Sequence, residues 1–301
     1  MNNTERKDVY TRITGQIISS LEQGVRPWIQ PWMAEHPAGP ITRPLRYTGE
    51  PYSGINVLML WASAAAQGFT APIWMTFRQA GELNAHVRKG EKGSLVVYAN
   101  AITKTESDRD GNEIERQIRF MRAYTVFNVE QIDGLVEIYY TRPEARYSGT
   151  KRIEHAEKFF ANTGAVVRYG GNLAYYAVEA DHIQMPAFEA FRDAEAFYAT
   201  LAHETAHWSR HPSRLNRDFG GKIWGDEGYA REELVAELVS AFLAADLELT
   251  PEVRDDHASY ISSWIEVLKG DPRAIFSAAA HAQRAVDFLH RLQKPEAKAA
   301  S

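Results

Sequence analysis

The residues best suited to chemistry form the run His203-Glu204-Thr205-Ala206-His207 in the second half of the chain. Residues four apart on an α-helix share one face, so both imidazoles can bind a single metal ion. Glu204 lies one position round the helix, close enough to hold a water molecule at the open position of that ion. This HExxH pattern is the signature of zinc metallopeptidases, in which the ion polarises a carbonyl group and the glutamate transfers the proton. The pattern predicts a metal site with His203 and His207 as ligands and Glu204 as the catalytic residue.

A third ligand must come from a carboxylate, because the chain has no cysteine and a catalytic zinc ion takes three protein ligands. Residues 230–247 are mostly apolar but contain Glu232, Glu233 and Glu237. A carboxylate buried among apolar side chains needs a partner. We predict that Glu233 is the third ligand and that Glu237, one helical turn further, holds a liganding histidine by a hydrogen bond. The exchange of these two roles stays open. Glu232 should point to another face of the helix and be solvated.

Several neighbouring residues could compete for a role at this site. Asp226 and Glu227 lie in a glycine-rich loop, and His211 follows the histidine pair after a further four positions. A histidine placed there, just before a proline, more often caps the end of the helix. His257 and Tyr260 could reach a transition-state oxyanion, or they could serve only in packing or at the surface.

Composition limits which metal ions can occupy the site and indicates where in the cell the protein is located. Two histidines and one glutamate suit zinc best, and manganese, cobalt or nickel can also occupy such a site. The absence of cysteine excludes disulfides, thiolate nucleophiles and cysteine-bound metal clusters. No apolar run approaches the ~20 residues that span a bilayer, and the polar start MNNTERKDVY lacks the core of a secretory signal. We therefore expect a soluble, cytoplasmic protein with no membrane partner. The formal net charge of −5 gives no general affinity for polyanions.

Periodicity and turn residues predict the elements of the first half of the chain. Residues 5–22 and 54–66 have helical spacing, whereas 94–103 and 114–128 have the pattern of two strands joined by a turn at Asp110-Gly111. The polar stretch 141–150 contains proline and glycine and marks a seam between domains.

The second half changes from strands to helices. Residues 165–185 alternate like strands, and Tyr175–Val178 could be an edge strand that pairs with an extended peptide or an ordinary sheet strand. Helices are predicted over about 187–210 and 230–247, from the cap Thr250-Pro251, and after Gly270-Asp271-Pro272. We predict an α+β protein with two domains, residues 1–142 with a β-hairpin and residues 150–295 with a zincin-like layout.

A resemblance to ArdC-type antirestriction proteins of conjugative plasmids rests on two groups of sequence runs. Their metallopeptidase domain is similar to TLAHETAHWSRHPSRLNRDFGG and YAREELVAELVSAFLAADL. Their N-terminal domain is similar to LEQGVRPWIQPW, YSGINVLMLW, WMTFRQAGELNAHVRKGEKG and FNVEQIDGL. A similar N-terminal domain occurs in some plasmid primases. The resemblance covers nearly the whole chain and shows no departure at the metal motif.

The resemblance implies a cytoplasmic protein that protects incoming plasmid DNA from host restriction during conjugation. The N-terminal domain would bind single-stranded DNA, and the C-terminal domain resembles SprT-like proteases, which act on proteins bound or crosslinked to DNA. By the family pattern, His203, His207 and one glutamate of EELVAE bind the metal, and Glu204 is catalytic. The implied partners are single-stranded DNA and a protein substrate, either DNA-bound proteins or restriction enzymes.

Single-stranded DNA needs cations for its phosphates and flat side chains for its bases, and the first domain offers both. Together with the resemblance, this predicts DNA contacts from Trp28, Trp32, Arg43, Arg46, Tyr52, Trp74, Phe77, Arg88, Lys89 and Lys92. The alternative is that the aromatic residues form the core of a loop-rich domain and that the basic turn is only solvated.

These features predict a zinc metallopeptidase that a single-stranded-DNA-binding module brings to its protein substrate by raising the effective concentration. The alternative is a non-proteolytic protein that coats single-stranded DNA and blocks restriction by occupancy, with a structural metal. A third hypothesis, a primase accessory, rests only on the shared N-terminal domain and predicts stimulated primer synthesis.

Overall fold

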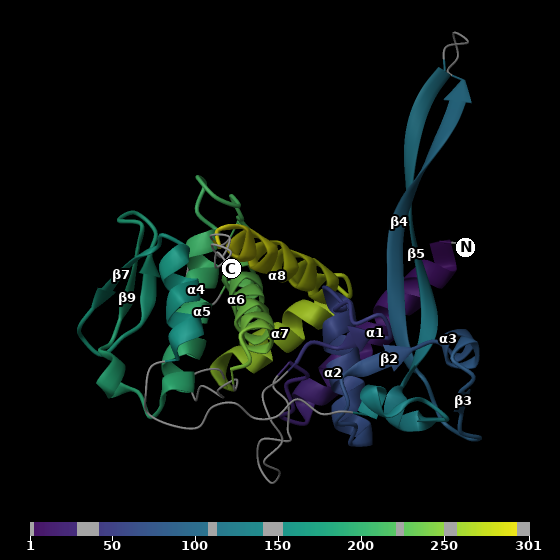
Figure 1. The fold of residues 1–301 in the computed structure, drawn as a ribbon. Coiled ribbons are helices and arrows are strands. Elements are labelled where there is room, and N and C mark those ends of the chain that lie inside the picture. The colour runs from purple at the N-terminus through teal and green to yellow at the C-terminus, as the bar shows by residue number, and fades with distance from the viewer. Residues whose placement is uncertain are drawn as a thin grey trace, which may run out of the picture.

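The computed structural model describes residues 3–28, 42–107, 113–140, 153–220, 226–249 and 258–293. Five predictions therefore concern residues outside these ranges: the turn at Asp110-Gly111, the seam at 141–150, Trp32, His257 and the helix start at Thr250-Pro251. Within the described ranges the fold is α+β, with a sheet-containing first half and a mainly helical second half (Figure 1). No helix in these ranges is both long and apolar enough to cross a bilayer.

The first half combines helices with a mixed sheet. The helices are α1 (Asn3–Glu22), α2 (Ile55–Gln67) and α3 (Phe77–Glu82). The sheet has the order β1 (Leu45–Arg46), β2 (Ile73–Met75), β5 (Glu113–Asn128) and β4 (Ser94–Ser107). β3 (His86–Val87) pairs with β6 (Ile132–Asp133), which lies between the 3-10 turns η2 (Val129–Gln131) and η3 (Glu137–Tyr140). The predicted helices and hairpin strands are present, with bounds that differ by a few residues.

The hairpin of β4 and β5 is much longer than the rest of its sheet. The two strands pair without interruption from Ser94↔Val126 to Ser107↔Glu113. Figure 1 shows this ribbon extending far beyond the helical body of the molecule.

The second half places a small sheet beside a group of helices. After α4 (Glu154–Asn162), the sheet has the order β7 (Val166–Tyr169), β9 (His182–Met185) and β8 (Tyr175–Ala177). The turn η4 (Phe188–Ala190) leads to α5 (Ala194–Ser209), α6 (Glu227–Asp246), α7 (Ala258–Gly270) and α8 (Ala274–Arg291). β8 is an edge strand and pairs antiparallel with β9. Its pairing with an extended peptide stays a prediction.

Two helix starts differ from the prediction because an aspartate caps each helix. The predicted helix from 187 begins only at Ala194, since the carboxylate of Asp193 accepts the Ala196 N–H at 2.8 Å. Helix α6 begins three residues before the predicted Ala230, since Asp226 accepts the Tyr229 N–H at 2.7 Å. Asp226 is therefore a helix cap, and its weaker candidacy as a metal ligand was wrong.

Helix α6 is the centre of the second half. It contacts α5, α7 and α8, and almost its whole length is buried, which explains its continuous apolar sequence. The two halves share one core, since Trp61 of α2 packs on Phe242 of α6 at 5.9 Å and Tyr10 of α1 packs on Phe276 of α8 at 4.5 Å. Helices α5 and α6 are thus fixed from both halves of the chain.

Candidate metal centre

The HExxH histidines lie on one face of α5, as the helical spacing predicts. Their rings are oriented so that the two Nε2 atoms are 3.2 Å apart. Both rings are largely buried, with side-chain exposures of 6% for His203 and 12% for His207. The helix therefore presents two nitrogen atoms to one point in the interior.

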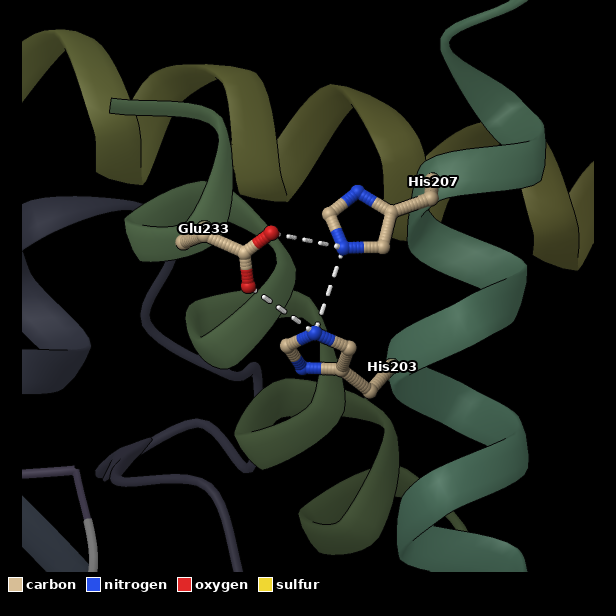
Figure 2. Close-up of side chains that lie close together, drawn as sticks. All are labelled: His203, His207 and Glu233. Carbon is tan, nitrogen blue, oxygen red and sulfur yellow. Dashed lines mark hydrogen bonds and ion pairs between the residues drawn. The ribbon is translucent and has the colours of Figure 1, made fainter. Parts of the chain in front are cut away.

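Glu233 of α6 completes this cluster from the facing helix (Figure 2). Its Oε2 lies 3.3 Å from Nε2 of His203, and its Oε1 lies 3.4 Å from Nε2 of His207. The ligand atoms of these three residues lie within 4.8 Å of one another. Of the two glutamates considered for the third position, Glu233 is thus the one that the structure brings to both Nε2 atoms.

The cluster fits a tetrahedral metal site by its dimensions. Ligand atoms about 2.0–2.2 Å from a tetrahedral zinc ion are separated from one another by roughly 3.3–3.6 Å. The separations of 3.2, 3.3 and 3.4 Å match these edges. In addition, each imidazole Nδ1 faces another carboxylate, which favours a proton on Nδ1 and leaves the Nε2 lone pairs directed at each other. Such an arrangement needs a cation between the two nitrogens.

The carboxylate behind His207 is Glu232, and the prediction that Glu232 is solvated was wrong. Its side chain is 4% exposed, and Oε1 lies 3.2 Å from Nδ1 of His207. Nε and Nη2 of Arg217 each donate to one Glu232 oxygen at 2.7 Å. Arg217 supplies the charge that makes burial of Glu232 tolerable, and sequence spacing gave no sign of this arginine because it lies outside both helices.

Glu237 occupies the equivalent place behind His203. Its Oε1 lies 3.7 Å from Nδ1 of His203, which is longer than a direct hydrogen bond but within ion-pair range. Two residues of the first half approach Oε2 of the same glutamate: Trp28, whose Nε1 donates at 3.4 Å, and Arg26, whose Nη1 lies at 4.0 Å. Glu237 therefore faces a histidine of the pair at ion-pair distance, but the predicted hydrogen bond between them is not formed, and Glu237 has two unforeseen partners in the first half.

The charges of this cluster favour a cation between its carboxylates. Burial opposes the protonation of His207, but Glu233 and Glu232 outweigh burial and raise the pKa of His207 to about 10. Burial also opposes ionisation of Glu232, yet Arg217 and His207 lower its pKa to about 2. For Glu233, burial is outweighed by His207 and His203, and its pKa lies well below the usual value. Without a metal ion, the carboxylates of the cluster thus favour a proton on His207.

Two tyrosines adjoin the third ligand. The Tyr229 side chain hydrogen-bonds to Glu233, and its hydroxyl lies 3.1 Å from that of Tyr260. Burial, followed by Tyr260 and the charge of Glu233, raises the pKa of Tyr229, so this hydroxyl remains a donor at neutral pH. Tyr260, for which an oxyanion role and a packing role were both open, contacts Tyr229 and stacks on Trp264, and its role at an oxyanion stays a prediction.

Of the remaining candidates near the motif, Glu204 is buried beside the histidine pair, whereas His211 and Glu227 have partners elsewhere. Glu204 is buried at 4% exposure between the two histidines of α5. His211 is directed away from the pair, with its Nδ1 2.7 Å from the hydroxyl of Ser213. Glu227 lies at the exposed start of α6 and pairs with Arg231. His211 and Glu227 are thus not members of the cluster.

Four of the predicted DNA contacts are in the interior, and their assignment to a DNA surface was wrong. Trp28, Trp74 and Tyr52 are 0%, 2% and 4% exposed, so no nucleotide base can stack on them. Arg43 pairs with Asp246 of α6 and has the ring of Phe242 4.8 Å from its guanidinium carbon. Aromatic residues beside prolines here form core, because burying a large ring stabilises a small domain more than exposing it.

The other predicted DNA contacts that the structure describes are exposed: Arg46, Phe77, Arg88, Lys89 and Lys92. Phe77 begins α3 and is 65% exposed, with its ring edge-on to Phe127 at 6.5 Å. Gly93 passes so close to that pair that a Cβ atom on it would lie 3.0 Å from the Phe127 ring. Lys92 therefore directly precedes a residue that lies against the partly exposed Phe127 ring.

Comparison with known families matches both halves of this arrangement. Residues 7–127 match the N-terminal domain of the anti-restriction factor ArdC, and residues 154–281 match a family of zincin-like metallopeptidases. The fold and the His203–His207–Glu233 cluster thus define a zincin-like metallopeptidase domain that follows an ArdC-type N-terminal domain.

Whole-chain similarity extends this result. The metal-free crystal structure of the antirestriction protein ArdC from plasmid R388 has a TM-score of 0.82 and 44% identity, covering 95% of this chain and 98% of that one. Its Mn(II)-bound structure has a TM-score of 0.79 and 42% identity, covering 96% and 99%. The protein y4eC of Sinorhizobium fredii is 46% identical over 95% of this chain and 92% of its own length. The chain belongs to the ArdC family of antirestriction proteins.

A longer relative is similar to nearly the whole of this chain. The DNA primase TraC of Escherichia coli is 38% identical over 94% of this chain, but the chain spans only 27% of that primase.

Proposed function

We propose that this protein is a metal-dependent peptidase that binds single-stranded DNA and protects incoming plasmid DNA from restriction in the cytoplasm of the recipient cell. The observation that supports the peptidase best is the convergence of His203, His207 and Glu233, with Glu204 on the same helix as the two histidines. A structural site has no need of a buried glutamate at that position of the motif.

The residues of the site have separate tasks in peptide hydrolysis. His203, His207 and Glu233 would hold the metal ion, and Glu232 and Glu237 would keep the proton of each imidazole on Nδ1. The bound ion would supply Lewis acidity toward the scissile carbonyl group. The Glu204 carboxylate would accept a proton from the attacking water and return it to the nitrogen of the leaving amine.

The native metal is proposed from the ligand set and the relatives. Two imidazoles and one carboxylate suit zinc best, and manganese, cobalt and nickel accept the same ligands. The R388 relative has an Mn(II)-bound structure, so manganese is the first alternative to test beside zinc.

Single-stranded DNA is the proposed partner of the first half. Phe77 offers an exposed ring for stacking, and Lys89 and Lys92 offer charge on a turn that contains Gly90. Gly90 has φ +92°, a conformation that favours glycine and lets backbone N–H groups approach phosphate. DNA binding would raise the effective concentration of the peptidase near proteins on the same DNA.

A second candidate function keeps the same fold but involves no peptidase activity. In it, the protein coats incoming DNA and blocks restriction by occupancy. Glu204→Gln distinguishes the two, with Glu195→Gln at the start of the same helix as the control variant. We expect Glu204→Gln to retain metal and DNA binding but to lose protection of an incoming plasmid in conjugation assays, together with DNA-stimulated proteolysis. Full protection by Glu204→Gln would instead support occupancy and overturn the peptidase.

A further inference from the structure

The metal centre is in contact with the first half of the chain through the segment that follows α1. Trp28 is completely buried, and its indole N–H donates to Oε2 of Glu237 at 3.4 Å. The guanidinium of Arg26, also buried, lies 4.0 Å from the same oxygen. A carboxylate in an apolar interior needs nearby donors or positive charge to remain ionised. Trp28 and Arg26 provide both to Glu237.

Glu237 in turn faces the histidine that begins the HExxH motif. Oε1 of Glu237 lies 3.7 Å from Nδ1 of His203, so the carboxylate is at ion-pair distance behind the imidazole ring. Nε2 on the other side of the same ring lies 3.3 Å from Glu233. The order of contacts is therefore Trp28 and Arg26, then Glu237, then His203.

The other histidine has a matching arrangement that stays within the second half. His207 is backed by Glu232, and Glu232 is held by Arg217. Each imidazole thus has one carboxylate behind it, and each carboxylate has an arginine. The two arrangements differ in distance, since the contacts behind His207 are 3.2 and 2.7 Å long and those behind His203 are 3.7 and 4.0 Å long. They differ also in the origin of the arginine: Arg217 lies between α5 and α6, whereas Arg26 comes from the first half of the chain.

Trp28 also lies at one end of a row of aromatic rings that ends beside the third ligand. Its ring is 5.8 Å from Trp264, which is stacked on Tyr260 at 6.1 Å. Tyr260 lies 6.0 Å from Tyr229, whose side chain hydrogen-bonds to Glu233. One residue of the first half is therefore connected by direct contacts to two of the three ligands.

We propose that Trp28 and Arg26 are positioning residues of the metal centre, so that the first half of the chain sets the metal affinity of the second. The proposal rests on the proposed function in taking the His203–His207–Glu233 cluster as a metal site. The proposal goes beyond that function because it gives the first half of the chain, for which only DNA binding is proposed above, a second role in supporting the metal site.

The test compares two tryptophan-to-phenylalanine variants of the full chain. Trp28→Phe removes the N–H that Glu237 accepts and keeps a ring against Trp264. Trp61→Phe is the control, because Trp61 is equally buried, also packs on α6 through Phe242, and donates its N–H to the carbonyl of Thr42 rather than to a carboxylate. The dissociation constants of Mn(II) and Co(II) are measured by competition with a chelator, at a temperature where circular dichroism shows each variant folded.

We expect Trp28→Phe to weaken metal binding by about 3–10-fold, less than the 10–100-fold typical for direct partners of a ligand, and Glu237→Gln to lie within that larger range. Arg26→Met, a second variant in case Trp28→Phe does not fold, should act in the same direction. The visible spectrum of the Co(II) protein should change in these variants, while Trp61→Phe should bind within about twofold of the parent chain.

Two results would overturn the proposal alone: an unchanged constant and Co(II) spectrum in both Trp28→Phe and Arg26→Met, or an equal loss in Trp61→Phe, which would indicate a general packing effect. A parent chain that binds neither metal would overturn the proposed function as well.

Discussion

Arg217 donates to both carboxylate oxygens of Glu232 at 2.7 Å, deep behind the metal-binding histidine pair. The same guanidinium donates to the carbonyl of Ala206 at 2.9 Å and to the hydroxyl of Ser209 at 3.2 Å. This one side chain therefore ties the end of α5 to the start of α6, the two helices that carry all the proposed ligands.

Removing this arginine should destabilise the protein strongly. Arg217→Met leaves the charge of Glu232 buried without its main partner, and we expect the free energy of unfolding of the metal-free protein to fall by about 3–5 kcal/mol. Urea denaturation followed by circular dichroism measures this. Arg231→Met on α6 is the control, because Arg231 pairs with Glu227 and Asp271 nearer the surface and should change the free energy by less than about 1 kcal/mol. Equal losses in both variants would contradict the role given to Arg217.

Loss of the third ligand should abolish tight metal binding without unfolding the chain. We expect Glu233→Ala to weaken Zn(II) and Mn(II) binding by more than about 100-fold, since even outer partners of a ligand contribute 10–100-fold. Isothermal titration of the chelator-treated protein gives the constants. Glu227→Ala, on the exposed start of the same helix, should bind metal like the parent chain. Wild-type affinity in Glu233→Ala would show that another residue is the third ligand.

The lysines of the exposed turn should set the salt dependence of DNA binding. Each phosphate contact on a single strand contributes about 0.7 to the slope of log K against log salt concentration. Lys89→Ala/Lys92→Ala should therefore reduce that slope by roughly 1.4 if both lysines contact phosphate. Fluorescence anisotropy with a labelled oligonucleotide at several salt concentrations measures it. Lys158→Ala, an exposed lysine of α4, serves as the control and should leave the slope unchanged.

The exposed phenylalanine beside that turn should act on affinity rather than on salt dependence. Stacking of a base contributes about 1–3 kcal/mol, so Phe77→Ala should weaken single-strand binding by roughly 5–150-fold with the same slope. Its ring contacts Phe127 only edge-on, and thermal unfolding should show a small change in stability. Unaltered affinity in Phe77→Ala would remove Phe77 from the DNA surface.

Acid should destabilise the protein through His281, whose ring packs edge-on against Phe219 at 5.1 Å. Burial and the charges of Arg284 and Arg217 lower the pKa of His281 to about 4. The unfolded chain binds this proton below about pH 6.5, before the folded chain does. The free energy of unfolding should therefore fall as the pH decreases from about 6.5 toward 4. In His281→Gln this contribution is absent, so urea titrations over that range should give a flatter profile than those of the parent chain.

The helices and the metal motif were accessible from sequence because their signals are local. Four-residue spacing places His203 and His207 on one face, and the mixed character of residues 230–247 indicates a helix whose glutamates are partly buried. Glu233 could be chosen because a third ligand was required and cysteine was absent. The helix starts at Ala194 and Glu227 were missed because the capping aspartates lie outside the apolar pattern.

The partners of the ligands could not be found this way, because they depend on contacts between distant segments. Nothing in the periodicity of α6 relates Glu232 to Arg217 or Glu237 to Trp28, and both glutamates are buried only because those partners are present. The buried DNA candidates failed for a related reason. A tryptophan next to a proline has the same local sequence whether its ring enters a core or remains at the surface.

The contact between Trp28 and Glu237 affects how the two domains can be exchanged between homologous proteins by recombination. Modules that meet only through a linker can be exchanged by recombination, and each keeps its properties. Here residues of the first and second halves of the chain are buried against each other beside the candidate metal centre. A chimera that takes its first domain from one homologue and its second from another must carry compatible residues at 26, 28 and 237. We therefore expect lineages to transmit these two domains as one unit, even where the pair is built into a much longer polypeptide.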